Sequence, residues 1–152
     1  MRHDESTHRT AAGIVAGLVA GVAFLVAMAL DILLTRSRAN DLRLLSGMVP
    51  GMGRFWPVLG TVMHMVNGAA LGALYAHIEH KFPGPGWVKG TVFALVENTL
   101  LWPIITVLDR VHPEIRSGRL PAFNRPVPFL QEVFRHVVYG AVLGWVYERL
   151  RR

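Results

Sequence analysis

The chain has 152 residues, no cysteine, a formal net charge of +6 and 52% hydrophobic residues. Its mean hydropathy is +0.36. This length suits one domain, and the apolar content is higher than that of an ordinary soluble domain of this size. The lack of cysteine excludes disulfides, thiolate metal sites and thiol catalysis.

The basic residues lie mostly between the apolar stretches and at the two ends of the chain. Lysine and arginine at such positions anchor transmembrane helices at phospholipid head groups. We find no nucleic-acid-binding motif. The charge pattern therefore predicts a lipid bilayer as the partner of this chain, and no nucleic acid.

Four stretches are apolar enough and long enough to predict transmembrane helices, since crossing the hydrocarbon core takes roughly 20 helical residues. In chain order they are residues 11–34, 56–78, 86–108 and 130–149. The first stretch is longer than the apolar core of a signal peptide, so we expect it to be retained. The fourth stretch is the least apolar. A proline-rich segment, 109–128, is expected to form an irregular loop on the membrane surface.

An internal repeat supports the fourth span. Residues 64–75 read HMVNGAALGALY and residues 136–147 read HVVYGAVLGWVY, with seven of twelve positions identical at an offset of 72. Upstream, Gly13 and Gly17 match Gly86 and Gly90 at an offset of 73. The repeats would cover about 11–80 and about 84–150. Each contains two spans and so returns the chain to its starting side, which predicts parallel repeats.

The predicted fold is therefore an all-α integral membrane four-helix bundle, a single domain over 1–152 made of two parallel two-helix repeats. Glycines spaced by four residues let helix backbones approach closely in lipid. In the second span this spacing predicts that one ridge, which includes Gly60 and Ala76, faces the bundle interior. The glycines expected to pack helices together are Gly13, Gly17, Gly68, Gly72, Gly140 and Gly144.

Ionisable residues inside a membrane are costly and usually paired or functional. Asp31 and Asp109 end the first and third spans, and His64 and His136 lie near the starts of the second and fourth. All four should therefore lie near one leaflet boundary. Two imidazoles and two carboxylates suit a divalent metal such as zinc, iron or manganese. The same histidines could instead ligate a b-type haem, because glycines follow each of them one turn later.

Two other interpretations of these residues remain open. Glu97 and Asn98 lie deep in the third span and could form a proton or solute pathway with the histidines. Alternatively, each histidine could bond to a neighbouring aspartate or carbonyl and only hold the helices in register. Glu132 and Arg135 are spaced to form an ion pair on one helical face.

The two H-x-x-x-G-x-x-x-G helices, HMVNGAALGALYAHIE and RHVVYGAVLGWVYERL, together with the glycine-rich first span, resemble small bacterial inner-membrane proteins of the YagU-like type. This resemblance implies four transmembrane helices and a multi-pass location in the bacterial inner (plasma) membrane. That family has no established activity, so the resemblance implies none for this chain.

We found no phosphate loop, nucleophile elbow or dinucleotide fingerprint that would favour an enzyme. The sequence therefore predicts a non-enzymatic membrane protein with a His-centred intramembrane site that binds a metal ion or haem b. It would act as a homo-oligomer or as a subunit of a larger membrane complex. The alternatives are a small transporter or channel-like subunit and a purely structural membrane subunit.

Overall fold

The structure, a computed structural model, describes residues 2–51 and 53–152, and in these ranges it contains helices and no strands. The long helices are α1 (Arg2–Thr35), α3 (Trp56–Ile78), α4 (Gly86–Val111) and α6 (Pro126–Leu150). The short ones are α2 (Asp41–Ser46), α5 (Pro113–Arg116) and the 3-10 turns η1 (Gly53–Phe55) and η2 (Glu79–Lys81).

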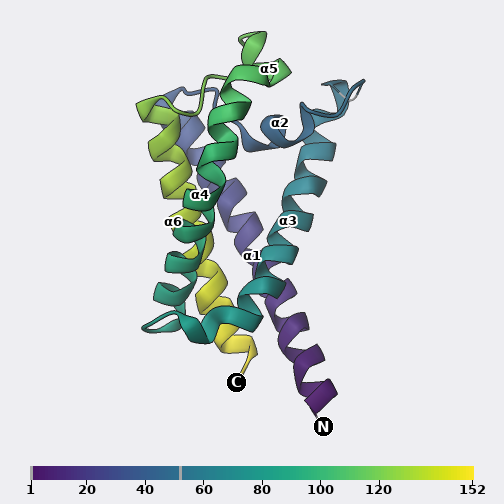
Figure 1. Cartoon of the computed structure of the whole chain (residues 1–152), viewed down its shortest axis with the longest axis vertical. Coiled ribbons are helices and arrows are strands. Elements are labelled where there is room, and N and C mark those ends of the chain that lie inside the picture. The colour runs from purple at the N-terminus through teal and green to yellow at the C-terminus, as the bar shows by residue number, and fades with distance from the viewer. Residues whose placement is uncertain (1, 52) are drawn as a thin grey trace.

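The long helices stand side by side, with α1 and α4 running in one direction and α3 and α6 in the other (Figure 1). α1 packs against both α3 and α6, and α6 packs against α4. The packing order is therefore α3, α1, α6, α4. Both chain termini lie at the same end of the bundle, and α2 and α5 lie at the opposite end (Figure 1).

Three helical segments are long and apolar enough to cross a membrane, namely Ser6–Thr35, Trp56–Lys81 and Gly86–Val111. Many of their large apolar side chains are exposed, including Val19, Val26 and Leu33 on α1 and Leu100 on α4. An exposed apolar surface of this extent suits contact with lipid rather than water. These features indicate a membrane protein.

The predicted stretches 11–34, 56–78 and 86–108 lie within α1, α3 and α4, and 130–149 lies within α6. α6 is not among the helices apolar enough to count as a candidate span. The segment 109–128, expected to be an irregular loop, is helical at its ends, where α4 continues to Val111 and α6 begins at Pro126, and it is irregular between them apart from the single turn of α5. The sequence analysis did not predict α2, which forms within the polar connection that follows α1.

Glycines hold α1 and α3 in direct backbone contact. A Cβ added at Gly17 would overlap the carbonyl oxygen of Gly68, and one added at Gly13 would overlap that of Gly72. The reciprocal contact is equally close at Gly72, where a Cβ would overlap the Gly13 oxygen, and looser at Gly68, where it would lie 3.0 Å from the Gly17 oxygen. Such close approach lets the helices gain van der Waals contact without a hydrophobic driving force.

The same contacts recur between α4 and α6. A Cβ at Gly90 would overlap the carbonyl oxygen of Gly140, and one at Gly144 would overlap that of Gly86. All six glycines expected to pack helices therefore lie in these two seams. The predicted ridge of α3, from Gly60 to Ala76, is buried along its length.

Tyrosines of α6 connect this helix to α3 across the edge of α1. The Tyr139 hydroxyl donates a hydrogen bond to the Gly68 carbonyl at 3.1 Å, and the Tyr147 hydroxyl donates to the Ala76 carbonyl at 3.3 Å. The rings of Tyr75 and Tyr147 meet edge to face with centroids 5.4 Å apart. The hydroxyls use carbonyl lone pairs that the helical hydrogen bonds leave free.

We expect Gly17→Ala to lower the free energy of unfolding by about 1–3 kcal/mol, because the added methyl group overlaps the backbone of α3. Gly21→Ala is the matched control, since a Cβ there would meet its nearest atom, Met65 Sδ, at 3.4 Å. Unfolding in mixed micelles with increasing denaturing detergent would measure both. Equal stability of the two variants would contradict the backbone contact.

Candidate functional site

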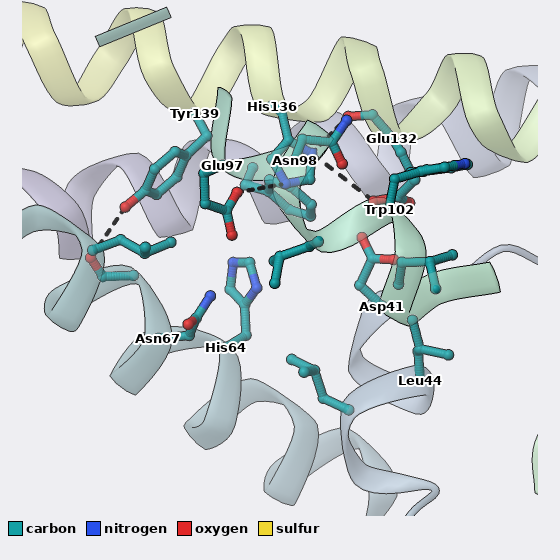
Figure 2. Close-up of a pocket in the computed structure, with 16 residues that line it drawn as sticks. Asp41, Leu44, His64, Asn67, Glu97, Asn98, Trp102, Glu132, His136 and Tyr139 are labelled. Atoms are coloured by element: carbon teal, nitrogen blue, oxygen red, sulfur yellow. Dashed lines mark hydrogen bonds and ion pairs between the residues drawn. The ribbon is translucent and has the colours of Figure 1, made fainter. Parts of the chain in front are cut away.

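A pocket lies between α3 and α4, at the end of the bundle where α2 lies, and has a volume of about 730 Å³ counting its open mouth (Figure 2). It is closed at the back by α1 and α6 and at one end by α2. Its lining is polar on one side and apolar on the other. The polar lining residues are Asp41, His64, Asn67, Glu97, Asn98, Glu132, His136 and Tyr139, and the apolar ones include Phe24, Leu44, Leu71, Leu101, Trp102 and Ile105.

The short helix α2 brings Asp41 to the pocket. The Asn40 side chain caps α2 by accepting a hydrogen bond from the Arg43 amide at 3.1 Å, as helix-capping asparagines do. α2 packs on α3 at Gly60, where a Cβ would overlap the Leu42 carbonyl oxygen. The absence of a side chain at Gly60 therefore fixes how deeply α2 enters between the long helices.

His64 is buried and contacts α1. Its Nε2 lies 3.2 Å from the Gly21 carbonyl oxygen, and because a carbonyl can only accept, Nε2 carries the proton. The Phe24 ring packs on the imidazole with centroids 4.8 Å apart. Among the described residues, Nδ1 of His64 has no hydrogen-bond partner, so it can accept a bond from a molecule in the pocket.

His136 makes two different contacts. Its Nδ1 donates to the Glu132 carbonyl oxygen at 2.7 Å, and its Nε2 lies 3.4 Å from Glu97 Oε2. The two contacts place the imidazole between the backbone of α6 and the Glu97 side chain of α4.

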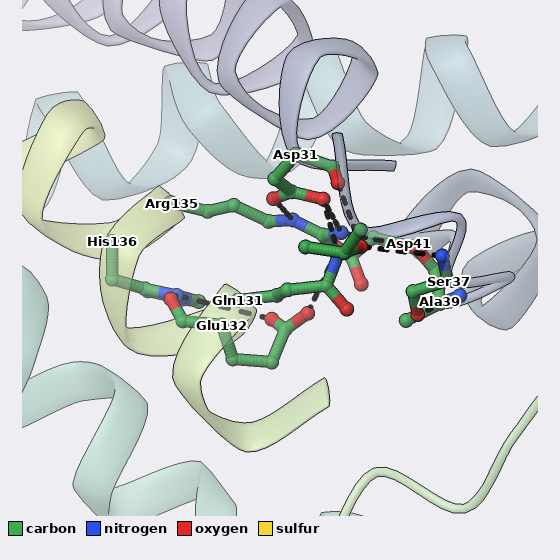
Figure 3. Close-up of polar contacts among 9 residues, drawn as sticks. Asp31, Ser37, Ala39, Asp41, Gln131, Glu132, Arg135 and His136 are labelled. Atoms are coloured by element: carbon green, nitrogen blue, oxygen red, sulfur yellow. Dashed lines mark hydrogen bonds and ion pairs between the residues drawn. The ribbon is translucent and has the colours of Figure 1, made fainter. Parts of the chain in front are cut away.

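Arg135 is fully buried and is the centre of a polar network (Figure 3). It binds both carboxylate oxygens of Asp31, through Nε at 2.6 Å and Nη2 at 2.7 Å. Its Nη1 donates to Asp41 at 3.0 Å and to Glu132 at 2.8 Å. Its Nη2 also donates to the Ala39 carbonyl at 3.0 Å. One guanidinium thus connects α1, the turn after it, α2 and α6, and the expected pair with Glu132 is present.

Negative charge exceeds positive charge around this network. The Asp31 carboxylate alone matches the charge of Arg135 and also accepts from the Gln131 side chain at 2.5 Å. Asp41 and Glu132 share the remaining donor of the guanidinium, and Oδ1 of Asp41 is buried without a hydrogen-bond partner. A buried carboxylate oxygen in this state has lost its water and gained nothing in return.

A second polar cluster, around His112 and Glu114, holds α2 on the side of α5. The buried imidazole of His112 donates from Nε2 to the Leu44 carbonyl at 2.9 Å and accepts from the Glu114 amide at 3.1 Å. The Glu114 carboxylate accepts a bidentate pair of hydrogen bonds from Arg119, at 2.7 and 2.8 Å, and forms an ion pair with Arg43 of α2 at 3.1 Å. Asp41 is thereby held in place from α3, α5 and α6 together.

Asp31 and Asp109, both expected at a metal or haem site, bind other partners in the structure. Asp31 is bound by Arg135, and Asp109 accepts hydrogen bonds from the backbone amides of Phe123 at 2.7 Å and Asn124 at 2.9 Å. Asp109 fixes the turn before α6 and does not line the pocket. Over residues 2–51 and 53–152, no three histidine, aspartate or glutamate side chains are grouped to hold a metal ion.

His64 and His136 do line one pocket, but the Phe24 ring contacts both, with centroid distances of 4.8 and 5.4 Å. A haem bound by both histidines would have to displace this ring, so the geometry gives it no support. Glu97 and Asn98, expected on a proton or solute pathway with the histidines, line the same pocket as they do. The sequence analysis missed Asp41, Phe24 and the central role of Arg135.

The comparisons with known proteins identify a family and no function. The family described as "Family of unknown function (DUF6789)" matches residues 7–152. The chain belongs to DUF6789. No curated protein and no solved structure matches it. The function of this DUF6789 chain must therefore be argued from its own pocket.

We expect Arg135→Met to lower the free energy of unfolding by about 3–5 kcal/mol, because it leaves buried carboxylates without their cation. The control is Arg152→Met, which breaks the exposed pair with Glu148 at 3.8 Å and should cost less than about 1 kcal/mol. Detergent unfolding of both variants would measure the difference. A small loss for Arg135→Met would show that the network does not stabilise the bundle.

Glu114 should make stability depend on pH. Hydrogen bonds from Arg119, helped by the charges of Arg119 and Arg43, lower the pKa of Glu114 below its usual 4.5. A carboxylate with a lowered folded-state pKa contributes its full share to the free energy of unfolding above the unfolded-state pKa. This contribution is lost as pH falls through the folded-state pKa. The difference in free energy of unfolding between the native chain and Glu114→Gln should therefore be constant above about pH 4.5 and shrink below it.

Stability measured in steps from about pH 6 to about pH 3 would test this dependence. Glu148→Gln serves as the control, since its side chain is 46% exposed and glutamine can also accept the hydrogen bond from the Gly86 amide, so its difference from the native chain should change little with pH. A difference for Glu114→Gln that grows on acidification would contradict the role given to Arg119.

Proposed function

We propose that this protein is a non-enzymatic membrane protein that binds a small lipid-soluble ligand in the pocket between α3 and α4. The observation that carries the proposal is the pocket itself, a cavity in a helical bundle with an apolar lining and a few convergent polar groups. Sites for small organic molecules have this character. His64 and His136, which the leading sequence hypothesis gave to a metal ion or haem, both line this pocket, and the ligand proposed in their place is an organic molecule.

The mouth of the pocket supports entry from the bilayer. Asn67 on α3 and Leu101 on α4 both line the pocket and are exposed at its edge. The outer surfaces of these two helices carry exposed apolar side chains such as Val62 and Ile104. A ligand dissolved in the hydrocarbon layer could therefore enter between α3 and α4 without crossing water.

We also infer that α6 is a fourth membrane span. Its low hydropathy comes from Gln131, Glu132 and Arg135, which are buried against α1 and α2 and do not face lipid. Its exposed side chains are apolar over much of its length and include Leu130 and Trp145. The resemblance to YagU-like proteins supports a multi-pass location in the bacterial inner membrane. The transporter and purely structural alternatives stay predictions.

Fluorescence of Trp102, which lines the pocket, would test ligand entry. Replacing the other tryptophans, Trp56, Trp87 and Trp145, by phenylalanine leaves Trp102 as the only reporter. In lipid nanodiscs we expect 11,12-dibromododecanol to quench Trp102 with a saturable component, because bromine quenches on contact and the pocket has a limited capacity.

Two substitutions on α3 provide the comparison for this experiment. Asn67→Phe narrows the mouth and should reduce the saturable component, whereas Val66→Phe points to the lipid side and should not, since Val66 is 63% exposed and lies outside the pocket lining. Quenching that rises linearly with probe concentration, and equally in both variants, would show that no ligand site exists.

A further inference from the structure

We infer that the ligand is a primary alkylammonium cation, whose ammonium group pairs with the carboxylates of Asp41 and Glu97 and whose alkyl chain lies along α3 and α4. This inference rests on the proposed ligand site and assigns its chemistry.

The charges around the pocket do not cancel. The carboxylates of the pocket and of the Arg135 network are Asp31, Asp41, Glu97 and Glu132. They face the guanidinium of Arg135 and, at most, one charged imidazole at His136. Even with Glu132 protonated, one negative charge is left uncompensated when the other three carboxylates are ionised. Charges removed from water must be paired or neutralised, and the environment of a lipid bilayer strengthens this requirement.

A free acceptor points to where a cation would bind. Asp41 is only 7% exposed, its Oδ2 accepts from Arg135, and its Oδ1 has no partner although it is buried at the pocket wall. Nδ1 of His64 is a second acceptor without a partner in the part of the chain that the structure describes. Figure 2 shows the side chains of Asp41, His64 and Glu97 arranged around the same space.

A primary ammonium group suits these acceptors. It carries one positive charge and three N–H donors, and it has no acceptor of its own. It could therefore satisfy the free oxygen of Asp41 together with one second acceptor of the pocket, the Glu97 carboxylate or the His64 nitrogen. Hydrogen bonds between charged partners are stronger than neutral ones, so the charge should contribute to selectivity as well as to affinity.

The remainder of the lining favours an alkyl chain. Leu71 on α3 and Leu101, Trp102 and Ile105 on α4 form the apolar side of the pocket. Trp102 is held in place by an edge-to-face contact with Phe129 at 4.8 Å. A chain lying between these residues would extend toward the mouth and the bilayer. A fully polar cation would leave this side of the pocket unused.

The test compares two probes of equal chain length, 5,6-dibromohexylamine and 5,6-dibromohexanol, whose bromines stay close to the head group, by quenching of Trp102 in neutral-lipid nanodiscs. We expect the amine to bind about 10- to 100-fold more tightly than the alcohol, the range for hydrogen bonds that involve a charged group. In Asp41→Asn and in Glu97→Gln the preference for the amine should fall, while binding of the alcohol persists and reports an intact pocket.

Glu79→Gln is the matched control, because Glu79 is a buried, ion-paired carboxylate at the opposite end of the bundle and should leave the preference unchanged. Equal saturable binding of amine and alcohol would show that protons already neutralise the carboxylates, which overturns this inference but keeps the ligand site. A preference that survives in both pocket variants also overturns it. No saturable binding of either probe overturns the ligand site as well.

Discussion

The burial of one guanidinium determines how this bundle is arranged. Arg135 is fully buried, and its donors are met by Asp31, Asp41, Glu132 and the Ala39 carbonyl. Because leaving such a charge unpaired would cost several kcal/mol, α1, α2 and α6 must meet around it. The same requirement brings more carboxylates to one place than a single cation can neutralise. The polar side of the pocket is therefore a consequence of how α6 is attached to the rest of the protein.

The position of the pocket follows from a difference between the two helix pairs. The glycine contacts of α1 with α3 and of α4 with α6 are alike, but the seam between the pairs is not. At the repeat offsets of 73 and 72, the counterparts of Asp31 and Arg135 are Ile104 and Met63, which cannot form an ion pair. α1 and α6 are joined by the salt bridge, whereas α3 and α4 are left apart with the pocket between them. The repeat itself stays a prediction, as does the role of α6 as a span.

Sequence patterns located the helices and their packing surfaces because these depend on local spacing. Glycines four residues apart predicted the close seams, since only the missing side chains allow backbones to touch. The depth of Asp31 and Asp109 in the membrane was also readable, but depth does not say which neighbour a side chain meets. The turn that returns α2 toward the bundle passes through Arg36, a non-glycine residue with φ of 55°. No pattern in the sequence predicts this turn. Asp41 was missed for this reason. Arg135 lowers the hydropathy of the fourth predicted span, but in the structure it is the most buried charged side chain.

The separation of the salt-bridge partners along the chain bears on how the protein is made. Within each hairpin the glycine contacts join neighbouring helices, so a hairpin can close soon after its second helix is synthesised. Asp31 and Arg135 are 104 residues apart, and α1 must therefore enter the membrane long before its partner exists. During that interval the Asp31 carboxylate has to remain near the head groups, be protonated, or be shielded by other proteins. Packing of α6 against α1 then completes the assembly, because it brings the only cation that reaches Asp31 in the described structure.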